Sequence, residues 1–197
     1  MTDVARTRMR DIGRAAIRAE LAQVAFELFR REGLEKVTLN DMAAAGGVSR
    51  STFLRYFGSK EEAILSAVGT QGEQIADALR ARPADEDDWT ALRHALDILV
   101  QHNRRDPARA LAITRLIMHT PALGTRRGQE KQTDWRRAIA QALADRAGPT
   151  HPPGVASQVR AAAALDCLNI AVNHWTASNG GLDLDDLLDE AFAALSP

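Results

Sequence analysis

The sequence has little that could support disulfide, thiolate or membrane chemistry. Cys167 is the lone cysteine, which excludes an internal disulfide and a site built from several thiolates, and a reducing cytoplasmic location is expected. No run approaches 18 apolar residues, and the first residues lack the apolar core of a signal peptide, so we expect a soluble protein that is not exported. Aromatic residues make up only 5% of the chain. Because alanine and leucine abound instead, helices are favoured over sheets.

The motifs of common enzyme classes are also missing. The chain has no nucleophile elbow, P-loop or dinucleotide-binding glycine pattern. His94 and His102 are too far apart to form one helical metal pair, and the acidic runs 85–88 and 183–186 fall at expected helix starts, where they complement the helix dipole. We therefore expect no catalytic residues, no metal and no cofactor. Besides a DNA-binding regulator and an enzyme, a helical adaptor that binds only proteins is a third class of function. Salt-dependent retention on DNA would distinguish a regulator from such an adaptor.

Charge is divided unevenly along the chain. A hydrophobic fraction of 45% and a charged fraction of 26% are those of a folded protein, and the net charge is -1. Residues 1–60 carry 11 Lys or Arg against 7 Asp or Glu, whereas residues 61–197 carry 14 against 19. A basic first part fits contact with phosphate, although chance asymmetry is the alternative.

Hydrophobic spacing and capping residues predict an all-α fold of about nine helices. In the first helix, residues 14–32, Ile17, Leu21, Val24 and Leu28 share one face, and Gly33 closes the helix. The remaining helices are expected at residues 39–45, 49–56, 59–80, 85–103, 107–119, 123–146, 155–178 and 184–195.

The closely spaced caps in the first third of the chain predict a helix-turn-helix. Thr38 and Asp41 form a capping box for the helix at 39–45, Ser49 caps the next helix, and Ser59 caps a long one. Two short helices separated by a glycine-containing turn make the motif, and a corner of two helices without DNA contact is the alternative. We expect a DNA-binding domain over residues 1–58 and a helical effector-binding and dimerisation domain over residues 59–197.

The helix that Ser49 caps has the polar first turn of a helix that enters a major groove. Arg50 can bond guanine O6 and N7, or contact phosphate only. Thr38, Tyr56 and Lys60 are expected to clamp the phosphate backbone, with partial core packing as the alternative for Tyr56. The expected DNA-binding residues are Thr38, Asn40, Ser49, Arg50, Ser51, Thr52, Arg55, Tyr56 and Lys60.

Four arginines come before the apolar face of the first predicted helix. An arginine-rich arm can enter a minor groove, and a solvated tail is the alternative. These residues are Arg6, Arg8, Arg10 and Arg14.

The segments AFELFRREG and VTLNDMAAAGGVSRSTFLRYFGSKEEAILSAV closely resemble the DNA-binding domain of TetR-family regulators. The resemblance rests on the helix spacing, both glycines, Val48–Ser49, Tyr56–Phe57 and Lys60, while Gly46 and Leu54 replace the usual alanine and tyrosine. It implies a homodimeric repressor that binds a palindromic operator and releases it when a small effector binds.

The second half more weakly resembles the sensor domain of mycofactocin-type regulators, in LIMHTPALGTRR, DWRRAIAQALADRAG and VNHW. That branch is associated with acyl-CoA-like effectors. Ordinary core packing is the alternative for each effector-binding candidate, namely Trp89, Leu96, Leu99, Arg115, Leu116, Met118, His119, Trp135, Ile139, Asn169 and Trp175.

The last two predicted helices are the best dimer surface, because small and apolar residues line one side of each. An internal core face is the alternative. The expected interface residues are Val159, Ala162, Ala163, Asp166, Ile170, Asn173, Leu184, Leu187, Leu188, Ala191 and Phe192.

Overall fold

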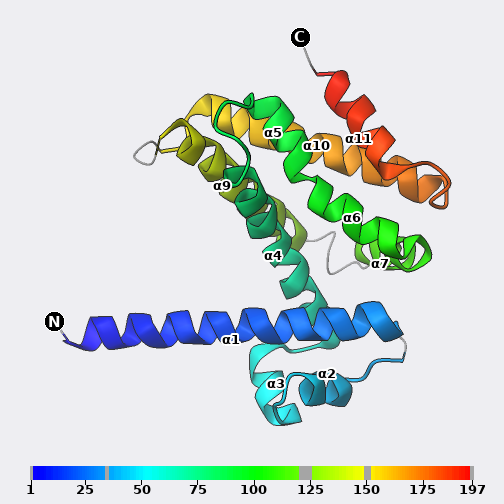
Figure 1. Ribbon diagram of the computed structural model, residues 1–197. Helices are drawn as coiled ribbons and strands as arrows, with labels where there is room; N and C mark the ends of the chain where they lie inside the picture. The colour runs from blue at the N-terminus through cyan, green and yellow to red at the C-terminus, as the bar shows by residue number, and fades with distance from the viewer. Residues whose placement is uncertain (1, 34–35, 120–125, 149–151, 196–197) are drawn as a thin grey trace. The chain divides into compact units, whose positions relative to one another are not determined.

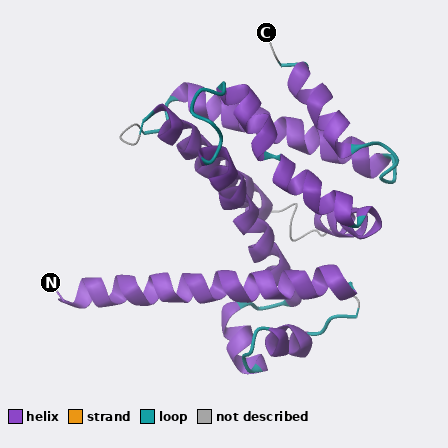
Figure 2. Cartoon of the chain, viewed as in Figure 1, coloured by secondary structure: helices purple, strands orange, loops and turns teal. Residues whose placement is uncertain are grey.

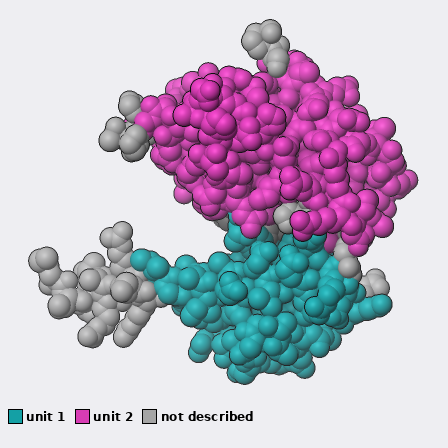
Figure 3. Space-filling view, in the orientation of Figure 1, with its two compact units in different colours: residues 1–70 teal, residues 71–197 magenta. Residues whose placement is uncertain are grey.

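The computed structural model describes residues 2–33, 36–119, 126–148 and 152–195. Within these ranges the chain forms ten helices and no strand (Figures 1 and 2), which confirms the all-α prediction. The chain divides into two compact units, residues 1–70 and 71–197 (Figure 3). The division falls within helix α4 (Lys60–Arg80), whereas the sequence placed the domain boundary just before this helix.

Unit 1 comprises α1 (Thr2–Glu32), α2 (Leu39–Ala45), α3 (Arg50–Tyr56) and the first turns of α4. The bounds predicted for α2 are confirmed, and α3 begins directly after its expected cap, Ser49. The prediction for α1 was too short, because this helix begins at Thr2 rather than Arg14. Residues 2–14 contain no proline, and their one glycine, Gly13, does not end the helix. The backbone hydrogen bonds of α1 therefore extend toward the N-terminus beyond the residues that form its apolar stripe.

The core of unit 1 is the surface on which α1, α2 and α3 meet. Of the predicted apolar face of α1, Leu21 and Leu28 are buried and Val24 is half-buried, but Ile17 is 49% exposed and lies outside the core. On α3 the rings of Phe53 and Phe57 lie 5.1 Å apart, and both are fully buried. The other buried side chains of these three helices are Ala22, Ala25, Phe26, Leu28, Phe29, Met42 and Ala43.

The turn between α2 and α3 depends on two glycines for different reasons. Gly47 has a φ of +67°, a left-handed conformation that side chains with a Cβ rarely adopt. Gly46 has an ordinary φ of -81°, but a Cβ there would lie 2.5 Å from the Cδ2 of Leu21. The departure from alanine at position 46 therefore accompanies a close approach of α1 to the turn.

Unit 2 comprises the rest of α4 and six further described helices. These are α5 (Asp88–Ala95), α6 (Asp97–Arg105), α7 (Pro107–His119), α9 (Arg126–Ala147), α10 (Val155–Ala177) and α11 (Leu184–Ala193). The bounds predicted for α7 are confirmed, and those for α10 and α11 differ only at their last residues. The start predicted at Leu123 lies outside the described residues.

The single helix predicted over residues 85–103 was wrong, because two helices occupy this stretch. Asp87 caps the first, accepting hydrogen bonds from the backbone N–H groups of Trp89 and Thr90. The ladder is interrupted at Leu96, where Leu96 N–H bonds the Arg93 carbonyl at 3.2 Å and the Leu96 carbonyl accepts from Leu99. No glycine or proline lies at this break between the two helices. Leu96 is buried, so we attribute the break to the packing of its side chain.

α10 is the one described helix whose length and mean hydropathy would suit a membrane span. The position of α10 in unit 2 accounts for part of this apolar composition, because one side of the helix packs in the core. The opposite side lies on the surface and is also partly apolar. Eight residues are buried: Ala161, Ala164, Leu165, Cys167, Leu168, Ala171, Trp175 and Thr176. Val155, Val159 and Ile170 are instead 79%, 61% and 53% exposed.

Charged residues fasten α11 to α5 and α6. The Arg93 side chain, 12% exposed, pairs with Asp97, Asp185 and Asp189. Arg104 also reaches Asp185, at 3.0 Å. Burial opposes the charge on Arg93, but its bonds to the three carboxylates outweigh burial and raise its pKa. The network positions α11 within unit 2.

Candidate nucleic-acid interface

Three hydroxyl groups lie together at the start of α3. Ser49 Oγ accepts a hydrogen bond from Thr52 N at 3.1 Å, as an N-cap should, and donates to Thr52 Oγ1 at 3.0 Å. Its oxygen also lies 2.9 Å from Ser51 Oγ. Ser49 and Ser51 are exposed and Thr52 is half-buried. The first turn of α3 therefore presents polar groups on a short, capped helix.

The two ends of α3 differ in what they expose. Arg50 at the N-terminal end is exposed, whereas Phe53 holds the opposite face of the helix in the core. At the C-terminal end the guanidinium of Arg55 lies 5.9 Å from the centre of the Tyr56 ring, and Tyr56 is half-buried. Arg50 thus has the freedom that a base-reading side chain needs, while Tyr56 combines core packing with a surface position.

Thr38 and Asp41 form the predicted capping box at the start of α2. Asp41 N donates to Thr38 Oγ1 at 3.2 Å, and Asp41 Oδ2 accepts from Thr38 N at 2.9 Å and from Thr38 Oγ1 at 2.7 Å. The side-chain bond from Thr38, followed by the backbone bond, lowers the pKa of Asp41. Thr38 and Asn40 are exposed. A DNA phosphate that accepts a hydrogen bond from the Thr38 hydroxyl would replace the bond from that hydroxyl to Asp41 Oδ2.

Lys60 connects the start of α4 to the loop before α2. Its Nζ donates to the carbonyl oxygen of Val37 at 3.3 Å, and the residue is half-buried. Ser59 caps α4 through a bond from Glu62 N at 3.1 Å, as predicted. Lys60 therefore lies one residue beyond a capped helix start, where N–H groups and the helix dipole favour an anion.

Sequence reasoning missed Arg18, which joins three helices of unit 1. Its guanidinium donates to the carbonyl oxygen of Tyr56 at 3.3 Å, to Ser66 Oγ at 2.7 Å and to Glu62 Oε1 at 3.1 Å, and lies 4.8 Å from the centre of the Phe57 ring. The last turn of α3 is thereby held against α1 and the start of α4. The only signal in the sequence was an arginine on the edge of the apolar stripe.

The expected effector-binding residues of unit 2 differ in how deeply they are buried. Leu96, Ile139 and Trp175 belong to the buried core of unit 2, Met118 and Asn169 are exposed, and Trp89, Leu99, Arg115 and Trp135 are half-buried. Trp135 packs against Gly72 on α4, and Arg115 bonds the side chain of Asn179. The side chains of Leu116 and His119 lie outside the described residues.

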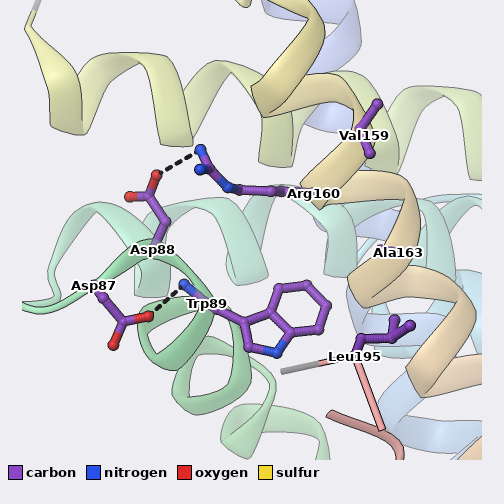
Figure 4. A pocket seen from close by; sticks show the side chains of 7 residues that line it. All are labelled: Asp87, Asp88, Trp89, Val159, Arg160, Ala163 and Leu195. Atoms are coloured by element: carbon purple, nitrogen blue, oxygen red, sulfur yellow. Dashed lines mark hydrogen bonds and ion pairs between the residues drawn. The ribbon is translucent and has the colours of Figure 1, made fainter. Parts of the chain in front are cut away.

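A surface groove of about 530 Å³ lies in unit 2, and of the effector-binding candidates Trp89 lines it (Figure 4). The start of α5, the first turns of α10 and the end of the chain line it, with the residues Asp87, Asp88, Trp89, Val159, Arg160, Ala163 and Leu195. Arg160 pairs with Asp88 at 3.2 Å, and Trp89 Nε1 donates to the carbonyl of Phe192. Apolar residues thus form most of a groove that opens on the outer side of α10.

The expected dimer residues fall into two groups. Those on α10 are at the surface: Val159, Asp166, Ile170 and Asn173 are exposed, and Ala162 and Ala163 are half-buried. On α11, Leu184, Leu188 and Phe192 are at most 5% exposed and pack in the core of unit 2, so their placement on an intermolecular surface is corrected. They face α5 and α10 within one chain, whereas Leu187 and Ala191 are half-buried. The α10 residues and Leu195 remain as one exposed face.

Comparison with known proteins matches both parts of the chain. Residues 21–67 match the bacterial regulatory proteins of the tetR family, and residues 86–197, more than half of the chain, match the MftR C-terminal domain. The chain belongs to the TetR family. The N-terminal match covers the packed half of α1, all of α2 and α3, and the start of α4. This TetR-family chain therefore carries the family's helix-turn-helix in unit 1.

Two curated relatives are transcriptional regulators. The HTH-type transcriptional regulator TcmR of Streptomyces glaucescens is 34% identical over 62% of this chain and 58% of its own length. The putative mycofactocin biosynthesis transcriptional regulator MftR of Mycobacterium tuberculosis is 30% identical over 65% of this chain and 64% of its own length. The match spans less than two thirds of either relative.

Solved TetR-family structures share the fold. A regulator from Rhodococcus sp. RHA1 superposes with a TM-score of 0.64 at 18% identity, covering 93% of this chain and 94% of that one. Thermus thermophilus FadR, a repressor solved in complex with lauroyl-CoA, has a TM-score of 0.58 at 22% identity, covering 90% and 92%. At these identities the likeness shows the arrangement of helices.

Proposed function

We propose that this TetR-family protein is a ligand-responsive repressor that binds a palindromic operator as a homodimer in the cytoplasm. The observation that carries the proposal is the exposed, capped first turn of α3, in which Arg50 stands beside the hydroxyls of Ser49 and Ser51. Such a turn suits entry into a major groove, because short polar groups and an arginine can reach base edges without steric conflict.

Contacts with the phosphate backbone would come from the residues around α3. Thr38 lies at the start of α2 and Lys60 at the start of α4, where helix N-termini attract anions, and Tyr56 ends α3. These residues would set affinity and register, while Arg50 would set sequence preference.

Two substitutions test this division. Arg50→Ala should weaken binding to the best operator by about 1–3 kcal/mol and relax its sequence preference, and Lys60→Ala should weaken binding to all duplexes and lower the salt slope by about one. Binding would be measured with a duplex selected from a random pool by the wild-type protein and with a scrambled duplex of the same length. Equal losses on both duplexes for Arg50→Ala would contradict its role as a base contact.

A homodimer would use the outer side of α10. One α3 reads too few base pairs to specify a site, and two-fold symmetry supplies a second helix about 34 Å away. The exposed apolar residues Val155, Val159, Ile170 and Leu195 would otherwise face water. The groove beside Trp89 would receive side chains of the partner subunit.

The dimer face can be tested by placing charge on it. Val159→Glu combined with Ile170→Glu should convert the dimer to a monomer in sedimentation experiments and abolish binding to the palindrome. Met118→Glu is the matched control, because Met118 is similarly exposed, at 44%, on α7. A double variant that sediments as the wild type would exclude this face.

An acyl-CoA-like effector is supported by the match to the MftR C-terminal domain and by the lauroyl-CoA bound in Thermus thermophilus FadR. α4 begins beside α3 and continues into unit 2, so a ligand that favours another tilt of α4 would change the separation of the two recognition helices. A 100-fold preference for that state supplies about 2.7 kcal/mol. Lauroyl-CoA, laurate and free CoA should be titrated into the protein–operator complex; unchanged operator affinity with all three would reject this effector class.

A further inference from the structure

The turn that follows α4 folds around one side chain of α9. Arg146 donates through Nη1 to the carbonyl oxygens of Leu79, at 3.4 Å, and Arg82, at 3.1 Å. Through Nη2 it donates to those of Pro83, at 3.0 Å, and Glu86, at 2.7 Å. The Arg146 side chain is only 7% exposed. One buried guanidinium therefore bonds four backbone carbonyls between the last turn of α4 and the start of α5.

The surroundings of this guanidinium suit its charge. Leu79 lies in the last turn of α4, where the carbonyl groups and the helix dipole favour a cation. Pro83 has no backbone N–H and so cannot continue the helix. Arg146 Nε lies 3.6 Å from Asp88 Oδ1, and the other carboxylate oxygen of Asp88 lies 3.2 Å from Arg160 Nη1 on α10 (Figure 4). The buried charge of Arg146 is thus paired with one carboxylate.

Two kinds of contact therefore hold the end of α4 in unit 2. Ile75, Ala76 and Leu79 are completely buried in the core of this unit. Apolar packing is non-directional and lets packed helices slide by small amounts, whereas a hydrogen bond weakens steeply when its angle changes. Packing thus places the end of α4 in the core, and the bonds from Arg146 fix the direction of the helix there.

A small change in that direction has a large effect at the other end of α4. The helix has 21 residues and is therefore about 30 Å long. A tilt of about 6° about one end of such a rod displaces the other end by about 3 Å. This displacement is close to the spacing of successive base pairs, about 3.4 Å. α4 begins in unit 1, next in sequence to α3, so its direction bears on where α3 is held.

We propose that Arg146 is a positioning residue that determines which spacing between operator half-sites the dimer accepts. By fixing the end of α4 in each subunit, its bonds hold the two α3 helices at one separation. The proposal rests on the proposed function, because it needs a homodimer on a palindromic operator. The described bonds of Arg146 all go to groups of unit 2, so it acts through α4 and affects spacing rather than base identity.

The test compares four full-length proteins on three duplexes. The duplexes are the palindrome that the wild type selects from a random pool, and versions with one base pair added to or removed from its centre. The proteins are the wild type, Arg146→Met, Arg146→Lys and the control Arg93→Met. Arg93 is the matched control because its side chain is 12% exposed and pairs with three carboxylates of α6 and α11. Losing it should destabilise unit 2 without freeing the end of α4, and urea unfolding compares the stability of the variants.

We expect the wild type and Arg93→Met to prefer the selected palindrome strongly. One added base pair shifts a half-site by about 3.4 Å and turns it by about a tenth of a helical turn. Arg146→Met should lose about tenfold of this preference, because a less restrained α4 can follow the displaced half-site. Arg146→Lys keeps the charge but has one terminal nitrogen in place of two, so it should be intermediate. Amides of residues 72–80 should exchange faster in Arg146→Met than in Arg93→Met.

The proposal is overturned if Arg146→Met keeps the wild-type preference for spacing. The same holds if Arg93→Met loses as much preference, because lower stability then explains the effect, or if the wild type binds all three spacings alike. If Arg146→Met does not fold, Arg146→Lys decides, and an unchanged preference in that variant rejects the role. In each of these cases specific binding of the palindrome leaves the proposed function standing. A wild type that selects no palindrome removes both.

Discussion

Replacing Arg18 by methionine would test whether one side chain holds the recognition helix in place. Methionine keeps much of the aliphatic stem but cannot donate to the Tyr56 carbonyl, to Ser66 Oγ or to Glu62 Oε1. It also removes the guanidinium that lies 4.8 Å from the centre of the Phe57 ring. The packing of α3 against α1 and α4 should therefore loosen without a change in the buried core.

The size of the effect follows from these interactions. A hydrogen bond in a protein contributes about 0.5–1.5 kcal/mol net, and a cation over an aromatic ring at an exposed site about 0.5–1 kcal/mol. The Arg18 side chain is 39% exposed, so the ion pair with Glu62 adds little more than its hydrogen bond. We expect the free energy of local opening in unit 1 to fall by about 2–3 kcal/mol.

Hydrogen exchange of the full chain measures this change directly. Amides of residues 18–33 and 50–66 should exchange about 30–150 times faster in Arg18→Met than in the wild type. The three tryptophans, at positions 89, 135 and 175, all lie in unit 2, so their fluorescence during urea unfolding reports the stability of that unit. Arg31→Met is the matched control, because Arg31 is 72% exposed and bonds only its neighbour Glu32 among the described interactions.

The reasoning is refuted if exchange in Arg18→Met stays within about twofold of the Arg31→Met control. Operator binding supplies a second check. Affinity should fall while the salt slope is retained, because the Arg18 guanidinium bonds protein groups. A lower slope would instead assign Arg18 to a phosphate.

Two further predictions concern unit 2. A Cβ at Gly72 would overlap Trp135 Cδ1, so Gly72→Ala should lower the free energy of unfolding of unit 2 by about 1–3 kcal/mol in a urea titration and shift the tryptophan emission; an unchanged urea midpoint would show that Trp135 can move aside without cost. The hydrogen bond from Arg82, with a smaller contribution from His94, lowers the pKa of Glu86 from 4.5 to about 2. The Glu86 carboxylate therefore stabilises the folded protein above pH 4.5, and this contribution is lost as the pH falls toward 2. Glu86→Gln should therefore be less stable than the wild type at neutral pH, and the difference in urea midpoint should vanish near pH 2; a difference that stays constant with pH would show that the charge of Glu86 is irrelevant.

Prediction from the sequence succeeded where the signal is local. The capping bonds of Thr38, Ser49 and Ser59 all form as expected, because each joins groups only three residues apart. Gly47 similarly ends a helix through its own backbone conformation. The positions of the short helices of unit 1 follow from these features.

Prediction failed where a residue's environment depends on distant parts of the chain. The break at Leu96 has no glycine or proline to announce it and is kept by burial in the core of unit 2. The apolar stripe of α11 suggested an outer surface, but Leu188 and Phe192 face inward because α5 and α10 cover them. Periodicity shows that a helix has an apolar side and is silent on which neighbour covers it.

By itself the amino-acid sequence determined the helical composition of this protein, the start and end of α2 and the first turn of α3, since caps and turn glycines act within one turn of backbone. Only the tertiary structure decided that Arg18 joins α1, α3 and α4, and that α10 rather than α11 keeps an apolar outer side. The physical reason is the same in both cases. Hydrogen bonds and burial between segments far apart in the chain depend on how the helices pack, and one-dimensional spacing does not contain that information.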